Sequence, residues 1–480
     1  MTTATVDAET PIGSTHRIDG YAVAVGAATV LFTAVFSVRM VLEYRRFNIL
    51  AFDLGIFDQG LWLLSRFQDP FVTVRGVHLF GDHTSYLMIP LAPLYWVAPH
   101  AETLLIFTVA LLAVGAPLAY YASRAVGATR LLASIVAIGY LAAPATQWNV
   151  RDTFHPELLV LPLLIGSFWL FARHHSWWGV MAAAVALLAK EDAALIVVPF
   201  GLLVWWYFDK RRPGLIIAAV GIVALWLSFE VLLPQFSPTG EMLYQWRYAR
   251  LGNGFFGIAT GLVIHPEVLG EALLDSLRWR YLALVVLPMP LALVAPRALL
   301  IAIPATLANF VSTHPYQYEI EYHYSVYLLI GVVIAAAIGA SRIGRLENSR
   351  LRDMAIVVSV VAALGFVTWS PLASPWAQTH PDQESVRTAI ALIPAEAPVS
   401  VWNLYLPHLT HRAVVYQYPN PWERHNYSAA GLALPDPAGV EWVLTRRGAS
   451  EHVTERLLGS GEFAVVYEEG PVLLLRRVAR

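Results

Sequence analysis

Residues 52–62 read FDLGIFDQGLW and follow an apolar run at about 21–42 that is long enough to cross a membrane. The stretch carries two carboxylates, Asp53 and Asp58, among glycines and a tryptophan. Five residues on an ideal helix correspond to about 140° of rotation, so both side chains cannot point into one small site. Asp53 is either the N-cap of a surface helix, for which Asp is favoured, or a functional group.

The composition indicates a membrane protein. Of the 480 residues, 57% are hydrophobic and only 14% are charged, which is unusual for a soluble domain. The net charge of −2 and the lack of a basic stretch with interleaved aromatics give no indication of nucleic-acid binding. The absence of cysteine excludes disulfides, thiolate metal sites and cysteine nucleophiles. No small-residue cleavage site follows the first apolar run, which we therefore expect to be a retained membrane helix.

Apolar runs of about 17 to 20 residues mark the expected membrane helices. The sequence predicts a polytopic α-helical protein with about eleven such helices, which places the termini on opposite sides of the membrane. Their approximate ranges are 21–42, 101–122, 130–146, 157–173, 176–189, 193–208, 214–233, 280–295, 298–312, 323–341 and 354–370.

Lys and Arg in short loops indicate the cytoplasmic side. Most of them fall on one face if the N-terminus is inside, although Arg45 and Arg46 oppose this arrangement. We expect a cytoplasmic tail at 1–20, a membrane domain at 21–371 and an extracytoplasmic domain at 372–480, in the cytoplasmic membrane. The supporting residues are Arg124, Arg130, Arg173, Lys210, Arg211, Arg212, Arg297, Arg342, Arg345, Arg350 and Arg352.

Two regions on the outer side have a composition of their own. The first outer loop, 43–100, contains the apolar stretch 84–98, which at about fifteen residues is too short to span and is predicted to lie along the surface. The segment 234–279 is predicted to form another outer loop. From about 372, one helical pattern is followed by short alternating runs, which predicts a small α/β domain.

The motif HLFGDHTS at 78–85 supplies a first group of candidate site residues. Asp82 or Thr84 could cap the next helix, which is the more common role of such residues. Alternatively, His78, Asp82 and His83 form a His/Asp/His cluster that binds a divalent ion or steers a phosphate.

The motif RDTFHPELL at 151–159 supplies Arg151, Asp152, His155 and Glu157. A proline in the first helical turn followed by an acidic residue is also typical of an ordinary helix start. The same His-Pro-Glu tripeptide recurs at 265–267, which lowers the specificity of this motif.

Three consecutive ionisable residues, Lys190, Glu191 and Asp192, separate two apolar runs. At a membrane boundary they are costly unless they face water, a partner or a substrate. We favour a functional role over a surface turn whose charges neutralise one another.

The outer stretch HPYQYEIEYHY at 314–324 contains His314, Glu319 and His323. If a helix has begun there, Glu319 and His323 share a face, either as a site wall or as a satisfied pair. Elsewhere the chain has no phosphate-binding loop, nucleophile elbow or zinc-protease histidine pair, so ATP-driven transport and serine hydrolysis are unsupported.

The stretches FDLGIFDQGLW, GDHTSYLMIPLAPLYWVAP and AKEDAAL together resemble the bacterial membrane proteins grouped as domain of unknown function 2079, over about 40–370. The architecture is also similar to the C-type superfamily of membrane glycosyltransferases, which use polyprenyl-phosphate sugar donors. That resemblance implies two membrane-parallel helices in the first outer loop, matched here by 53–65 and 83–98. It also accommodates a soluble outer domain at the C-terminus.

The resemblance assigns roles to two residues. Asp53 takes the position of the superfamily's catalytic acidic residue, and Lys190 that of a lysine that approaches the lipid phosphate. Position 54 is Leu where many members have a second acid, so a paired acidic site is not reproduced. Glu191 and Asp192 are additional to the pattern.

The leading hypothesis is therefore a membrane glycosyltransferase that moves a sugar from a polyprenyl-phosphate donor to a lipid or glycan acceptor of the cell envelope. Asp53 would accept the acceptor's proton, and Lys190, Arg151 or a bound divalent metal would meet the phosphate. The alternative is a transporter, lipid flippase or assembly scaffold, but we find neither internal repeats nor a charge in the middle of a span. The supporting site residues are Asp58, Asp82, His83, Arg151, Asp152, His155, Lys190, Glu191, Asp192, His314, Glu319 and His323.

Overall fold

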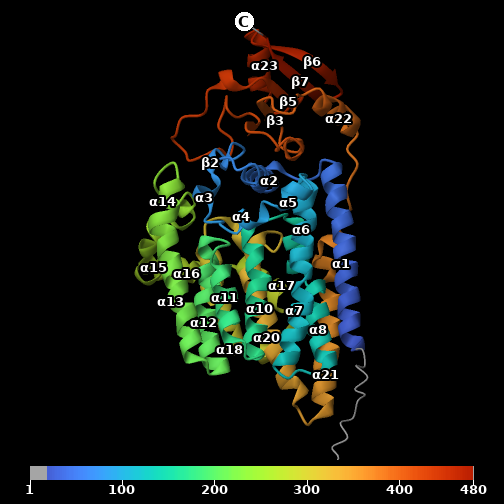
Figure 1. Ribbon diagram of the computed structural model, residues 1–480, viewed down its shortest axis with the longest axis vertical. Helices are drawn as coiled ribbons and strands as arrows, with labels where there is room; N and C mark the ends of the chain where they lie inside the picture. The colour runs from blue at the N-terminus through green and yellow to red at the C-terminus, as the bar shows by residue number, and fades with distance from the viewer. Residues whose placement is uncertain (1–18, 479–480) are drawn as a thin grey trace, which may run out of the picture.

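The computed structural model describes residues 19–478 and shows a tall helical bundle with a small sheet domain at its upper end (Figure 1). The predicted tail at 1–20 lies outside the described residues except for its last two positions. The helices of the bundle and its loops are α1 (Gly20–Arg45), α2 (Ala51–Ser65), α3 (Leu79–Asp82), α4 (Met88–Leu91), α5 (Leu94–Val97), α6 (Ala101–Ala113), α7 (Gly115–Ala125), α8 (Arg130–Ala142), α9 (Pro144–Arg151), α10 (Val160–Ala172), α11 (Ser176–Ala186), α12 (Ala194–Phe208), α13 (Arg211–Leu227), α14 (Leu233–Phe236), α15 (Gly254–Ile264), α16 (Pro266–Leu274), α17 (Ser276–Val286), α18 (Pro296–Leu299), α19 (Ile303–Val311), α20 (Val326–Gly344) and α21 (Ser349–Gly365).

Many of these helices are long and apolar enough to cross a membrane. Within residues 19–478 six qualify by length and composition, and up to eight if each of two bent pairs counts as one span. The six are Gly20–Arg45, Ala101–Ala125, Glu191–Phe208, Arg211–Phe236, His323–Gly344 and Ser349–Trp369. The bent pairs are α8 with α9, at 41°, and α15 with α16, at 74°.

The remaining predicted spans differ in length or continuity. Those at 157–173, 176–189 and 298–312 correspond to the shorter apolar helices Pro156–Ala172, Ser176–Ala186 and Pro296–Val311. The predicted span 280–295 is wrong at its C-terminal end, because the α-helix does not continue to residue 295.

The chain there forms α17 and then the 3-10 helix η5 (Pro290–Val294). Pro288 and Pro290 explain the interruption, because proline lacks the N–H that continues a helix. The segment 234–279 is also more than the predicted outer loop, since it contains the apolar pair of α15 and α16.

The predicted surface helix at 83–98 is likewise broken. The structure has α4 and α5 within this range, with Pro90 inside α4 and Pro93 at the start of α5, and α3 lies just before it. By contrast, α2 forms over nearly the predicted range and lies at the top of the bundle, below the sheet domain (Figure 1). The loop also contains a two-stranded ribbon of β1 (Phe71–Val72) and β2 (Val77–His78).

The C-terminal domain is a five-stranded mixed sheet with the strand order β4-β3-β5-β7-β6. Strand β3 pairs in parallel with both β4 and β5, and the remaining pairs are antiparallel. Its elements are α22 (Gln383–Ala391), β3 (Val399–Val401), β4 (Val415–Gln417), β5 (Trp442–Arg446), α23 (Glu451–Gly459), β6 (Phe463–Glu469) and β7 (Val472–Arg477). This confirms the small α/β domain that follows the membrane part.

Asp58 joins the C-terminal domain to α2. Its carboxylate is fully buried, accepts hydrogen bonds from the hydroxyls of Tyr95 and Thr410, and lies 3.1 Å from Nε2 of His411. Burial opposes a charge on His411, but the Asp58 carboxylate outweighs this and raises the pKa of the imidazole. Asp58 therefore links α2 in the first loop to the sheet domain through hydrogen bonds and an ion pair.

The centre of the bundle is α20, which is almost completely buried against α7, α8, α10 and η5. The packing depends on close backbone approach, because a Cβ added at Gly339 would lie 1.9 Å from the carbonyl oxygen of Leu291. A backbone oxygen cannot rotate away as a flexible side chain can. Gly339 is thus a contact point between α20 and η5.

We expect Gly339→Ala to destabilise the protein by about 1 to 3 kcal/mol, the usual effect of overpacking. Thermal unfolding of the detergent-purified protein would show this as a lower midpoint. Gly139→Ala in α8 is the matched control, because a Cβ there meets nothing within 4 Å. Equal midpoints for the two variants would contradict the close contact between α20 and η5.

Candidate active site

Asp53 lies in the first turn of α2 and is not its N-cap. Leu50 occupies the cap position, and the N–H of Ala51 donates instead to Oδ1 of Asn403, at 2.9 Å. The Asp53 side chain is 40% exposed, and its Oδ1 lies 3.5 Å from Nε2 of His155. The capping interpretation is therefore wrong, and the carboxylate contacts His155 while remaining partly exposed.

His155 belongs to a short connection between α9 and the 3-10 helix η1 (Pro156–Leu159). The neighbouring Asp152 directs Oδ2 at His323, which lies far along the chain at the start of α20. This oxygen is 2.8 Å from both the backbone nitrogen and Nδ1 of His323, and 3.9 Å from Nδ1 of His155. The two imidazole rings stack with their centroids 3.6 Å apart.

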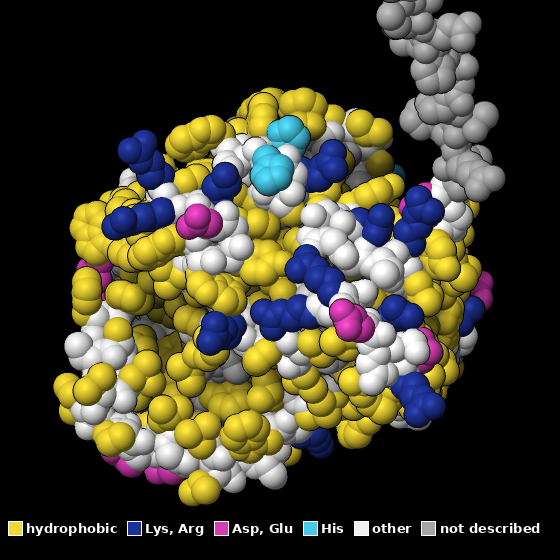
Figure 2. Space-filling model, turned by 90° about the horizontal axis from the view of Figure 1, so that it is seen from below, with side chains coloured by type: hydrophobic (Ala, Val, Ile, Leu, Met, Phe, Trp, Pro, Cys, Tyr) yellow, Lys and Arg dark blue, Asp and Glu magenta, His cyan; other side chains and the backbone are white. Residues whose placement is uncertain are grey.

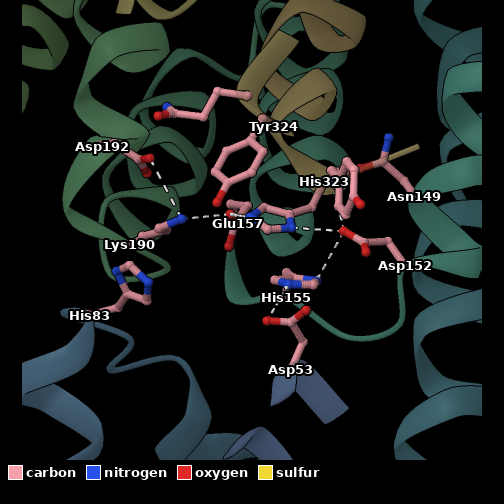
Figure 3. A network of polar contacts seen from close by, with 12 residues as sticks. Asp53, His83, Asn149, Asp152, His155, Glu157, Lys190, Asp192, His323 and Tyr324 are labelled. Carbon is pink, nitrogen blue, oxygen red and sulfur yellow. Dashed lines mark hydrogen bonds and ion pairs between the residues drawn. The ribbon is translucent and has the colours of Figure 1, made fainter. Parts of the chain in front are cut away.

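The network continues from His323 to the buried lysine. Nε2 of His323 lies 3.3 Å from Oε1 of Glu157, which accepts a hydrogen bond of 2.6 Å from Nζ of Lys190. Lys190 is also 3.7 Å from Asp192, whose other oxygen accepts from the Tyr327 hydroxyl. Figure 3 shows the resulting chain of polar groups, which runs from Asp53 through the two histidines to Asp192.

Four carboxyl groups share this network with one lysine and two histidines. Burial disfavours the imidazolium of His155, but the carboxylates of Asp152 and Asp53 outweigh this and raise its pKa to about 9. Burial in turn raises the pKa of Asp152 above its usual range. The site therefore favours positive charge beside Asp53 and Asp152.

A cavity of about 360 Å³ adjoins the lysine end of the network. Most of its wall is apolar and comes from α13, α15 and α19, and its polar groups gather where Lys190 and Asp192 lie. His83 also lines it and is fixed by Glu191, whose carboxylate lies 2.7 Å from the ring and accepts from the N–H of Thr84. The cavity thus combines a mostly apolar wall with several charged side chains.

Arg247 is the cation in the cavity wall that sequence reasoning did not identify. Its NH1 group donates to the Tyr324 hydroxyl at 3.1 Å, and its guanidinium lies over the ring of Tyr244, 4.4 Å from the centroid. Nε has no hydrogen-bond partner, and no carboxylate within residues 19–478 forms an ion pair with Arg247. The aromatic stretch YQWRYAR in an outer segment was the available signal.

The motif HLFGDHTS does not form the predicted metal cluster. His78 lies 3.1 Å from Asp69, Asp82 lies 3.6 Å from Arg75, and His83 faces Glu191. Because each residue has its own partner, their side chains do not converge. Asp82 instead accepts a hydrogen bond from the hydroxyl of Tyr244, at 2.7 Å, and so positions part of the cavity wall.

Three other predicted residues lie outside the central network. Arg151 is 4.0 Å from the buried Glu43, and the ring of His314 packs against that of Trp246. The predicted helical pairing of Glu319 with His323 is wrong, because separate 3-10 turns occupy 315–318 and 323–325. Among the described residues His323 is paired with Asp152 and Glu157.

Glu157 of the motif RDTFHPELL, which also fits an ordinary helix start and was left out of the supporting site residues, belongs to the network. Its His-Pro-Glu tripeptide has a duplicate at 265–267, where His265 and Glu267 form an exposed pair at 3.1 Å. Local sequence is the same in both places. Only the tertiary fold, which buries Glu157 beside Lys190, distinguishes them.

Comparisons with known proteins identify the family and the fold. The model of the family described as "Predicted membrane protein (DUF2079)" matches residues 43–472. No curated protein matches the sequence. Among solved structures, the chain is similar to ArnT from Cupriavidus metallidurans bound to undecaprenyl phosphate, with a TM-score of 0.55 and 14% identity. The match covers 96% of this chain and 99% of that chain, which confirms the resemblance to the C-type fold.

Proposed function

We propose that this chain, which belongs to the DUF2079 family of predicted membrane proteins, is a glycosyltransferase that uses a polyprenyl-phosphate sugar donor. The acceptor would be a lipid or glycan of the cell envelope. The observation that carries the proposal is the mostly apolar cavity lined by the cations Lys190 and Arg247, beside a network that leads to Asp53. The similar fold of ArnT, solved with undecaprenyl phosphate, supports it.

The cavity suits a lipid phosphate better than a soluble one. Its apolar wall from α13, α15 and α19 can hold the first isoprene units, which favour such surfaces over water. The phosphate requires positive charge, and Glu157 and Asp192 already compensate Lys190. We therefore assign the main phosphate contact to Arg247, with Lys190 as the second cation.

The transfer needs one base and one anion site. Asp53 takes the proton of the acceptor hydroxyl while the acceptor oxygen forms a bond to the anomeric carbon. The bond from that carbon to the phosphate oxygen breaks, and its electron pair leaves with the lipid phosphate. Arg247 stabilises the resulting negative charge. Asp53 is accessible enough to meet an acceptor, because its side chain is 40% exposed.

The location of the site supports transfer on the outer face of the cytoplasmic membrane. Lys and Arg side chains gather on the lower face of the bundle (Figure 2), opposite the end that carries α2 and the sheet domain (Figure 1). Basic residues also stand at helix ends, with Arg124 near the end of α7, Arg130 at the start of α8 and Arg342 in the last turn of α20. By the positive-inside rule this lower face is cytoplasmic.

Binding of polyprenyl phosphate to the nanodisc-reconstituted protein tests the donor site. We expect Arg247→Gln to weaken binding about 10- to 100-fold, as expected for the loss of hydrogen bonds to a charged group. Arg250→Gln is the control, since Arg250 is exposed and pairs with Glu271. The proposal fails if the wild-type protein does not bind the lipid or if both variants bind it equally well.

A further inference from the structure

The strongest unassigned feature is the convergence of three metal-ligating side chains. One carboxylate oxygen of Asp152 and one ring nitrogen each of His155 and His323 lie within 4.8 Å of one another. They come from two parts of the chain, since Asp152 and His323 are 171 residues apart, and Figure 3 shows the three side chains close together. We propose that Asp152, His155 and His323 bind one divalent transition-metal ion of the zinc type.

The orientation of both imidazoles supports this assignment. Each ring turns Nδ1 toward Oδ2 of Asp152, at 3.9 Å from His155 and 2.8 Å from His323. Nε2 of His155 faces the Asp53 carboxylate at 3.5 Å, and Nε2 of His323 faces the Glu157 carboxylate at 3.3 Å. A carboxylate that accepts from one ring nitrogen fixes the tautomer whose other nitrogen ligates a metal. The site therefore has ligands and supporting carboxylates in the arrangement that metal-binding histidines use.

An unsatisfied buried group provides an independent observation. His155 is only 3% exposed, yet neither of its ring nitrogens has a hydrogen-bond partner. Buried polar groups are normally satisfied, and an exception of this kind often marks an unobserved ion or water. A metal ion at Nδ1 would satisfy one nitrogen, and a small approach by Asp53 would satisfy the other.

The three ligand atoms can bind one small ion once the two imidazole rings, which now stack at 3.6 Å, turn apart. Zinc with bonds of about 2.0 to 2.2 Å holds tetrahedral ligands roughly 3.4 Å apart. That value lies between the two observed separations from Asp152 Oδ2, so the ion would draw His155 inward and separate the stacked rings.

The ligand types also select the class of metal. Two imidazoles and one carboxylate favour zinc, manganese, iron or cobalt over magnesium and calcium, which prefer oxygen ligands throughout. Three protein ligands leave a position open for a substrate oxygen, as in catalytic zinc sites. The ion could activate an acceptor hydroxyl only if the protein transfers sugars as proposed above. The binding of the metal ion itself does not depend on that proposed function.

Metal content tests the site directly. The tag-free protein would be stripped with EDTA, incubated with one to two equivalents of zinc, passed over a desalting column and analysed by inductively coupled plasma mass spectrometry. We expect one zinc per chain, and at least a 100-fold loss of affinity, measured by chelator competition, in His155→Gln and His323→Gln. Cobalt in place of zinc would add a visible absorption spectrum that reports on the coordination of the ion.

The duplicated tripeptide supplies the matched control. His265→Gln changes the same His-Pro-Glu sequence at an exposed position and should keep full zinc affinity. Gel filtration and thermal unfolding would establish that each variant is folded. The metal site is refuted if the folded wild-type protein takes up no zinc, or if His265→Gln loses as much affinity as His155→Gln. Because this measurement involves no sugar transfer, failure of the proposed function would leave it unaffected.

Discussion

Replacing Asp53 by Asn should lower the rate of sugar transfer by about two to four orders of magnitude, the usual contribution of a general base. The substitution keeps the size of the side chain, and Asp53 is partly exposed, so the fold should be retained. Transfer from a radiolabelled polyprenyl-phosphate sugar into an envelope lipid extract, with the enzyme in nanodiscs, measures the effect. A flippase would instead move the lipid without forming a glycosylated product.

Asp69→Asn is the matched control for this experiment. Asp69 lies in the same loop, its side chain is 75% exposed, and it contacts His78, which lies outside the network. Zinc content measured in the same Asp53→Asn sample separates loss of the base from loss of a metal ion. Full transfer activity in Asp53→Asn would rule out the catalytic assignment.

Lys190→Met should destabilise the protein by about 3 to 5 kcal/mol. The substitution leaves Glu157 without the lysine that neutralises it. Glu157 is almost completely buried, and Nζ of Lys190 lies 2.6 Å from its carboxylate. Without the lysine, an uncompensated charge stays in a region of low dielectric constant. Chemical denaturation of the detergent-solubilised protein, followed by tryptophan fluorescence, would show the loss.

The double variant Lys190→Met/Glu157→Gln distinguishes this cause from a general packing defect. Removing the charge of Glu157 as well should recover much of the lost stability, because the fully buried carboxylate is then neutral and only Asp192, which is more exposed, loses its contact with Lys190. The double-mutant cycle then gives a large interaction free energy between the two positions. Strictly additive effects would show that Lys190 and Glu157 do not stabilise one another.

Helix geometry alone predicted that Asp53 and Asp58, both within residues 52–62, would not point into the same site. A rotation of about 140° between Asp53 and Asp58 predicts different surroundings. In the structure Asp53 faces His155 on the bundle side, and Asp58 faces Thr410 in the sheet domain. The small C-terminal domain was predictable for a similar reason, since its alternating short runs contrast with the long apolar runs before it.

The rest of the site depends on contacts between distant parts of the chain. Asp152 and His323 are 171 residues apart, and no local pattern relates them. Arg247 lies in a segment whose helices are short, so periodicity gave no indication of which way its side chain points. Glu157 and Glu267 share the same tripeptide, and only burial beside Lys190 distinguishes the first from the second.

The attachment of α2 to the sheet domain has a consequence for biosynthesis. The N–H of Ala51 and the carboxylate of Asp58 find partners in Asn403 and Thr410, each 352 residues later in the chain. A nascent chain is made and inserted from its N-terminus, so α2 emerges long before these partners exist. The hydrogen bonds that hold α2, the helix that carries Asp53, to the sheet domain can therefore form only after the C-terminal domain has been made.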